Sequence, residues 1–176
     1  LGVSEILTSL MLVYVAELLL DYMVRGPLRD PKGFNFPQSV TFDDVARLPF
    51  LADGERLHLG VLLALIVLGV SAFVFARTLF GFEVRLVGEA PRAARFAGFS
   101  DKRLTLAVFA ISGALAGLAG IAEVAGQIGQ LQPKISPGYG FTAIIVAFLG
   151  RLSPFGILVA SLVLALTYIG GEAAQV

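Results

Sequence analysis

The chain has 176 residues, of which 57% are hydrophobic and only 15% charged, and its formal net charge is zero. Soluble domains average roughly 45–50% apolar and about 25% charged residues, so this composition favours a chain with long runs that face lipid. The zero net charge gives no indication of a nucleic-acid partner, and the absence of cysteine excludes disulfides and thiolate metal sites.

Four apolar runs are long enough to cross a membrane, and in chain order they span about residues 6–24, 59–77, 104–129 and 154–172. An α-helix rises 1.5 Å per residue, so about 20 residues cross a hydrocarbon core of roughly 30 Å. A fifth run, 139–150, lies between Pro- and Gly-rich stretches, and its length suits a short or re-entrant helix. The sequence therefore predicts an all-α, polytopic transmembrane helical bundle. We expect residues 1–176 to be part of a single membrane domain of a longer protein.

Three carboxylates lie in or beside the apolar runs, namely Glu17, Asp21 and Glu123. Ionisable side chains are costly in a membrane and by default indicate a function. Glu17 and Asp21 share a helix face, but Asp21 is close to the loop that begins at Arg25, so an interfacial or hydrogen-bonding role is the alternative. Aromatic side chains add surfaces on which a base or a sugar could stack, or they fill the core. The candidate pathway-lining residues are Glu17, Glu123, Tyr139 and Phe141.

The run 104–129 is rich in small residues. Gly113 and Gly117 are four residues apart, and Gly120 follows. Small residues at this spacing let helix backbones approach closely in lipid, although Gly/Ala richness is also common in any membrane helix. The sequence predicts close helix packing at these three glycines.

Two hydrophilic connections, 25–58 and 78–103, separate the first three long runs. Residues 77–103 hold six Lys or Arg in 27 residues, whereas 25–58 hold five in 34. Positive charge near the spans favours the cytoplasmic side, so the count slightly favours 77–103 as cytoplasmic and 25–58 as the outer loop.

The middle of the second connection is typical of a short amphipathic helix. Pro91 suits a first helical position, Glu89 before it complements the positive helix end, and Gly98 suits a helix stop. Such a helix fits a groove on another protein, or equally forms a basic surface against anionic lipids. Its small face would comprise Ala93, Ala94 and Ala97, and its charged face Arg92 and Arg95.

No pattern in the chain indicates an enzyme. No lysine completes a GxxxxGK[ST] phosphate loop, and no serine has a histidine base beside it in the sequence. The single histidine, His58, stands at the edge of an apolar run without partner ligands for a metal.

The stretch from Val87 to Gly129 resembles the cytoplasmic loop and following helix of permease subunits in ABC importers for branched-chain amino acids, simple sugars and nucleosides. RAARFAG, residues 92–98, is similar to the alanine-rich loop of that family, and GYGFTAIIVAFLGRLSPFGILVASL, residues 138–162, to its next element. VRGPLRDPKGFNFPQS, residues 24–39, looks like the nucleoside and simple-sugar subgroup. The resemblance covers almost the whole chain.

The resemblance implies a multi-pass permease of the cell membrane (inner or plasma membrane) whose coupling helix lies within 88–99. Expected partners are a cytoplasmic ABC ATPase that binds the ATP, a second permease subunit (a related chain or a copy) and an extracytoplasmic solute-binding protein. No cofactor and no enzymatic activity of its own are expected. The implied coupling residues are Glu89, Arg92, Ala93, Ala94, Arg95 and Gly98.

The sequence departs from the family pattern in two places. Arg92 stands where the family loop has its glutamate, and Glu17 and Asp21 occupy positions expected to be neutral. The implied solutes are nucleosides or related simple sugars. A branched-chain amino acid permease and an ion-coupled secondary transporter that uses Glu17, Asp21 or Glu123 are the alternatives.

Overall fold

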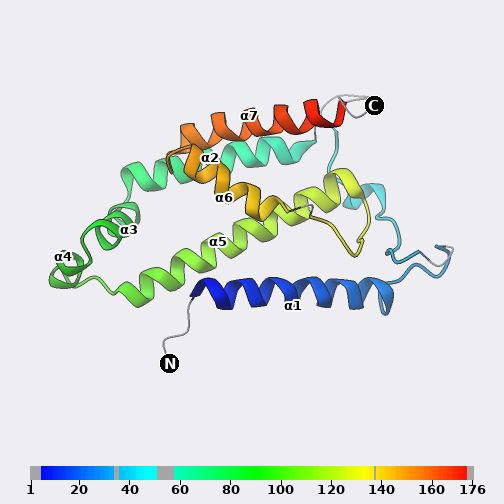
Figure 1. Ribbon diagram of the computed structural model, residues 1–176, viewed down its shortest axis with the longest axis horizontal. Coiled ribbons are helices and arrows are strands. Elements are labelled where there is room, and N and C mark those ends of the chain that lie inside the picture. The colour runs from blue at the N-terminus through cyan, green and yellow to red at the C-terminus, as the bar shows by residue number, and fades with distance from the viewer. Residues whose placement is uncertain (1–4, 34–35, 51–57, 137, 174–176) are drawn as a thin grey trace. The chain divides into compact units, whose positions relative to one another are not determined.

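The computed structural model describes residues 5–33, 36–50, 58–136 and 138–173. In this part of the chain all the regular elements are helices, as predicted, and the β pairing consists of two isolated bridges, Arg29 with Ser39 and Phe50 with His58. Four helices are long and apolar enough to cross a membrane. Figure 1 shows the elements in chain order.

Helix α1 (Glu5–Arg25) is followed by a connection that contains the short 3₁₀ helix η1 (Asp44–Ala46), and then by α2 (Leu59–Arg77). Helices α3 (Leu79–Glu89) and α4 (Pro91–Phe96) lead into α5 (Asp101–Glu123). The π-helix η2 (Val124–Ile128) continues α5, and α6 (Tyr139–Leu149) and α7 (Pro154–Ala173) complete the chain. The apolar side chains along the spanning helices are mostly exposed, as expected where lipid is the solvent.

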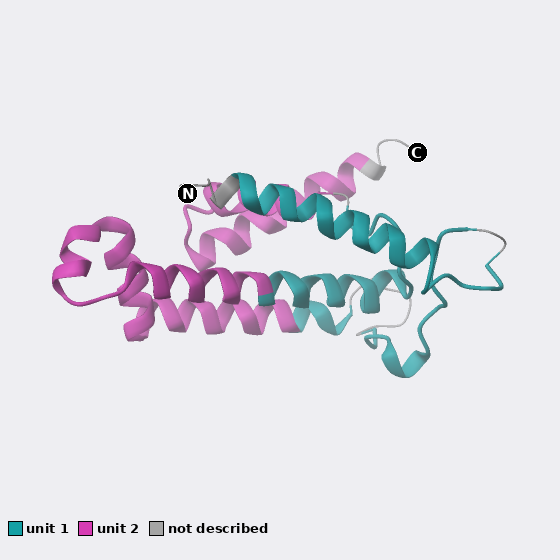
Figure 2. Cartoon of the chain, turned by 90° about the horizontal axis from the view of Figure 1, so that it is seen from below, with its two compact units in different colours: residues 1–62, 114–137 teal, residues 63–113, 138–176 magenta. Residues whose placement is uncertain are grey.

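The chain divides into two compact units, which Figure 2 shows in different colours. Unit 1 comprises residues 1–62 and 114–137, and unit 2 comprises residues 63–113 and 138–176. Helices α2 and α5 each contribute residues to both units.

Helix α3 was not predicted from the sequence, which indicated only one short helix between residues 78 and 103. Thr78 begins it, because its hydroxyl accepts a hydrogen bond from the Gly81 N–H and donates one to the Val74 carbonyl. A Cβ on Gly81 would lie 2.5 Å from that same carbonyl oxygen, so only glycine fits where α3 turns against the end of α2.

The short run 139–150 forms α6, which packs against α7 in unit 2. Gly150 and Gly156 lie in backbone contact, and a Cβ on Gly150 would be 2.5 Å from the Ile157 nitrogen. The Ser153 hydroxyl accepts from the Gly156 N–H at 3.1 Å and so caps α7. The two helices therefore form a tight helical hairpin.

Candidate functional site

The α4–α5 corner, residues 90–105, lies within unit 2 and is built from local contacts. The Phe99 N–H donates to the Ala94 carbonyl, and the Gly98 N–H donates to the Arg95 carbonyl, both at 3.0 Å. Gly98 has φ +85°. This is a Schellman motif, in which glycine takes the left-handed position just past the helix end. It places Gly98 where the sequence predicted the stop of the short helix.

A salt bridge connects the two helices of the corner. The Arg95 Nε lies 2.7 Å from the Asp101 Oδ2. Asp101 is the first residue of α5, where an acidic side chain also interacts favourably with the positive end of the helix. The Arg95 side chain is 73% exposed and that of Asp101 is 28% exposed. Arg95 therefore already has a partner within its own chain.

The two neighbours of Arg95 on α4 differ completely in exposure. Ala94 is fully buried, whereas Phe96 is 94% exposed. Aromatic residues are enriched at the centres of protein interfaces, so the exposed Phe96 is a candidate contact for a protein partner. The sequence analysis did not single out Phe96.

The other predicted coupling residues occupy different parts of the corner. Glu89, which was expected just before the short helix, is the last residue of α3, and Ala90 is the N-cap of α4. Arg92 and Ala93 are exposed on α4. The predicted small-residue face is thus divided, because Ala94 is buried whereas Ala93 is exposed. A role of these residues in coupling stays a prediction.

A second structure, the loop–helix junction, joins residues 38–48 to residues 124–131 in unit 1. Ser39 exchanges two hydrogen bonds with Leu131, one from its backbone N–H at 2.9 Å and one to its hydroxyl at 2.8 Å. The Phe42 N–H donates to the Gly129 carbonyl at 2.8 Å, and the Leu48 N–H to the Ala125 carbonyl at 3.0 Å. The π-helix η2 interrupts the regular hydrogen-bond pattern of an α-helix. Backbone N–H groups of the connecting segment donate to carbonyls in and just after η2.

His58 fills the space that two glycines leave in this unit. Its Nδ1 accepts a hydrogen bond from the Gly60 N–H at 3.1 Å. A Cβ on Gly60 would lie 2.5 Å from the His58 ring, and one on Gly126 would lie 2.6 Å from it. His58 is therefore a buried packing residue that contacts the π-helix.

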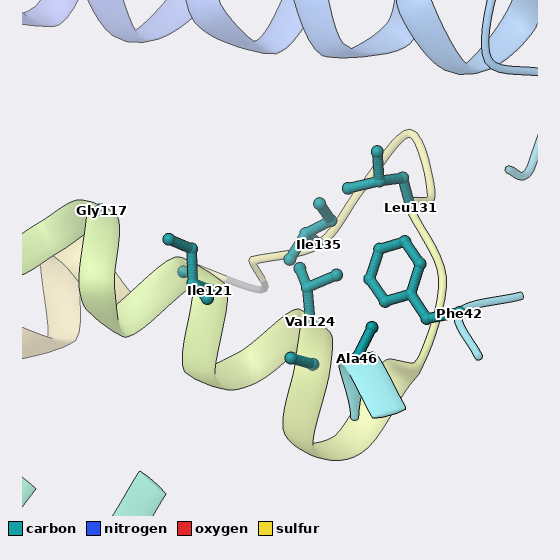
Figure 3. Close-up of a pocket in the computed structure, with 9 residues that line it drawn as sticks. Phe42, Ala46, Gly117, Ile121, Val124, Leu131 and Ile135 are labelled. Atoms are coloured by element: carbon teal, nitrogen blue, oxygen red, sulfur yellow. The ribbon is translucent and has the colours of Figure 1, made fainter. Parts of the chain in front are cut away.

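An apolar pocket of about 500 Å³ opens beside the junction (Figure 3). Phe42 and Ala46 enter it from the connecting segment, and Leu131 and Ile135 from the segment after η2. Helix α5 and the start of η2 supply the remaining lining residues, which are Gly117, Gly120, Ile121, Val124 and Ala125. The lining lacks the polar groups that would orient a sugar or a nucleoside.

Two of the three glycines predicted to pack helices, Gly117 and Gly120, line this pocket. A Cβ on either, or on Gly113, would meet no atom of the described chain within 4 Å. Close helix packing at these positions therefore stays a prediction.

The candidate pathway residues lie on different helices. Glu17 is exposed on α1, and Glu123 is the last residue of α5 before the π-helix, both in unit 1. Tyr139 and Phe141 are exposed in the first turn of α6, in unit 2. Asp21 forms a salt bridge of 2.7 Å with Arg25 at the end of α1, which agrees with an interfacial position. Pathway lining by the other four residues stays a prediction. No cluster of three metal-ligating side chains occurs among the described residues.

These features define a multi-pass helical protein of the cell membrane with short helices and ordered segments outside its spans. The chain belongs to the family described as the permease component of branched-chain amino acid transport systems, whose sequence model matches residues 1–176.

Several curated relatives are similar over nearly the whole chain. A glucose ABC transporter permease protein of Haloferax volcanii is 44% identical over 99% of this chain and 48% of its own length. A nucleoside ABC transporter permease protein of Lactococcus lactis is 32% identical over 97% and 49%, and a guanosine ABC transporter permease protein of Bacillus subtilis is 33% identical over 96% and 49%. The chain thus spans about half the length of the curated relatives it matches. No solved structure matches.

Proposed function

We propose that the complete protein is a permease subunit of an ATP-driven importer and that α4 couples it to a separate ATPase. The observation that carries the proposal is the exposed Phe96 on a short helix fixed between α3 and the start of α5. An exposed aromatic residue on a short helix is a suitable anchor for a pocket on a protein partner. The remaining partners follow the family pattern, namely a second permease subunit and a solute-binding protein, with ATP hydrolysed by the ATPase.

The order of helices along the chain supports a placement of α4 and the loop–helix junction on opposite sides of the membrane. One helix long enough to span, α2, separates residue 48 from α4, so a single crossing would place η1 and α4 on opposite sides. A crossing by α5 would return the chain to the side of η1, and the hydrogen bonds between residues 38–48 and 125–131 require these two segments to be on the same side. We propose that α4 is cytoplasmic and the junction extracytoplasmic.

We propose nucleosides or related simple sugars as the solutes. The names of the similar permeases in Haloferax, Lactococcus and Bacillus support this solute class. The salt bridge of Asp21 with Arg25 weighs against an ion-coupled transporter that uses this carboxylate as a free cation site.

Co-purification tests the coupling proposal. The full-length wild-type permease, extracted in detergent with its ATPase, should retain the ATPase, and Phe96→Ala should reduce retention about tenfold or more, as expected for an interface anchor. Phe36→Ala is the matched control, because Phe36 is also exposed but lies in the connection on the proposed opposite side. Equal retention by Phe96→Ala and wild type would contradict the role of α4.

Uptake of radiolabelled solutes tests the solute proposal separately. Cells that express the complete transporter should take up glucose or guanosine in an ATP-dependent manner, and unlabelled leucine should not compete. Competition by leucine with no uptake of sugar or nucleoside would instead favour a branched-chain amino acid permease.

A further inference from the structure

Arg95 was expected to face the ATPase, but the structure gives it a partner within the chain. We infer that Arg95 and Asp101 are a positioning pair that holds the α4–α5 corner rigid, so that displacement of α4 is transmitted to the start of α5. This inference rests on the proposed function, since it assigns a role to these residues in the same coupling step.

Two kinds of contact connect α4 to the start of α5. The Schellman motif fixes the backbone from Ala94 to Phe99 with two hydrogen bonds. Ala94 is buried and α4 packs against α3, which holds α4 from its other end. The Arg95–Asp101 salt bridge then crosses the turn at 2.7 Å and joins the side chains of the two helices. Movement of α4 relative to α5 would have to break both the hydrogen bonds of the turn and the salt bridge.

The two members of the pair are not equivalent. The Asp101 Oδ1 is shielded from solvent and accepts no hydrogen bond in the described structure, so the carboxylate depends on Arg95 through its other oxygen. Arg95 is 73% exposed, and water can hydrate its guanidinium if Asp101 is removed. Loss of Arg95 therefore leaves a poorly solvated carboxylate, whereas loss of Asp101 leaves a solvated cation.

This asymmetry predicts a specific pattern in three variants of the full-length transporter, Arg95→Ala, Asp101→Ala and the double variant. Arg95→Ala should lower solute uptake per ATP hydrolysed about three- to tenfold, and Asp101→Ala about two- to threefold. The double variant should recover to the level of Asp101→Ala, because the unpaired carboxylate is gone. All three should insert into the membrane and retain the ATPase, since Phe96 is unchanged.

The alternative is that Arg95 binds the ATPase directly. In that case Asp101→Ala would behave like wild type, and the double variant would be as poor as Arg95→Ala and would lose the ATPase; either result would overturn the inference. Failure of the proposed function is distinguishable, because the wild-type permease would then retain no ATPase at all.

Discussion

The loop–helix junction and the α4–α5 corner are held together by different kinds of contact. At the junction, Ser39 and Leu131 are 92 residues apart in the chain, and their bonds connect two segments that the sequence separates. At the corner, the salt bridge joins Arg95 to Asp101, which are six residues apart. The long-range hydrogen bonds of the junction fix the connecting segment against the end of the long helix. Local contacts fix the shape of the corner and leave its exposed side chains accessible to a partner.

The same difference appears in the side chains that each region buries. Unit 1 buries Ser39 at the junction and His58 next to the π-helix, two polar residues that form hydrogen bonds within the unit. The corner buries Ala94 and exposes Phe96. The junction is therefore stabilised by hydrogen bonds of buried polar residues, whereas the corner is stabilised by backbone hydrogen bonds and an exposed salt bridge.

The largest expected effect is at Gly126 in the junction. Gly126→Ala would place a Cβ 2.6 Å from the His58 ring, and the ring cannot retreat freely because it is also held against the Gly60 backbone, whose N–H donates to its Nδ1 at 3.1 Å. Overpacking of this kind costs about 1–3 kcal/mol. Thermal unfolding of the purified protein in detergent should show this loss, and His58→Ala in the same background should relieve part of it.

Gly69→Ala in α2 is the matched control, because a Cβ there meets nothing within 4 Å in the described structure. The junction account would be wrong if Gly126→Ala and Gly69→Ala unfolded at the same temperature.

The next effect concerns Gly98 at the corner, which has φ +85°. Alanine at a left-handed position costs roughly 1–2 kcal/mol, whereas asparagine tolerates it better. Uptake and ATPase retention should therefore be highest for Gly98→Asn, lower for Gly98→Ala and lowest for Gly98→Trp, since tryptophan adds a bulky side chain to the backbone strain. If asparagine and alanine were equally harmful, the left-handed conformation would not be what matters at this residue.

The smallest effect is expected at Ser39, whose hydroxyl accepts from the Leu131 N–H at 2.8 Å. Ser39→Ala removes this acceptor in a buried position and should cost about 1 kcal/mol in thermal stability. Ser161→Ala is the control, because that exposed hydroxyl bonds only the Leu158 carbonyl of its own helix. Equal effects of the two substitutions would mean that the Ser39 bond does not stabilise the junction.

The length of the apolar runs was sufficient to predict the spanning helices, because about 20 consecutive apolar residues match the length of a helix that crosses a bilayer. Gly98 was also predictable as a helix stop, since a left-handed residue past a helix end favours glycine. Helix α3 was missed because Glu83, Arg85 and Glu89 made its segment resemble a loop.

The junction had no signal in the sequence. Nothing in the residues around Ser39 or His58 indicates that they contact the end of α5, because such pairs are specified only when the chain is folded. The division of α4 into a buried Ala94, a paired Arg95 and an exposed Phe96 likewise depends on how α4 packs in its unit.

Cysteine labelling with a membrane-impermeant thiol reagent tests the central claim most directly. The full-length protein, with any cysteine outside residues 1–176 replaced, would carry Ala93→Cys on exposed α4, Ala94→Cys as its buried neighbour, or Val45→Cys in η1, where the residue is 99% exposed. The account predicts that residue 93 is labelled only from the cytoplasmic side and is protected by bound ATPase. Residue 94 should stay unlabelled, and residue 45 should be labelled only from the opposite side. Labelling of residues 93 and 45 from the same side, or no protection of residue 93 by the ATPase, would contradict the account.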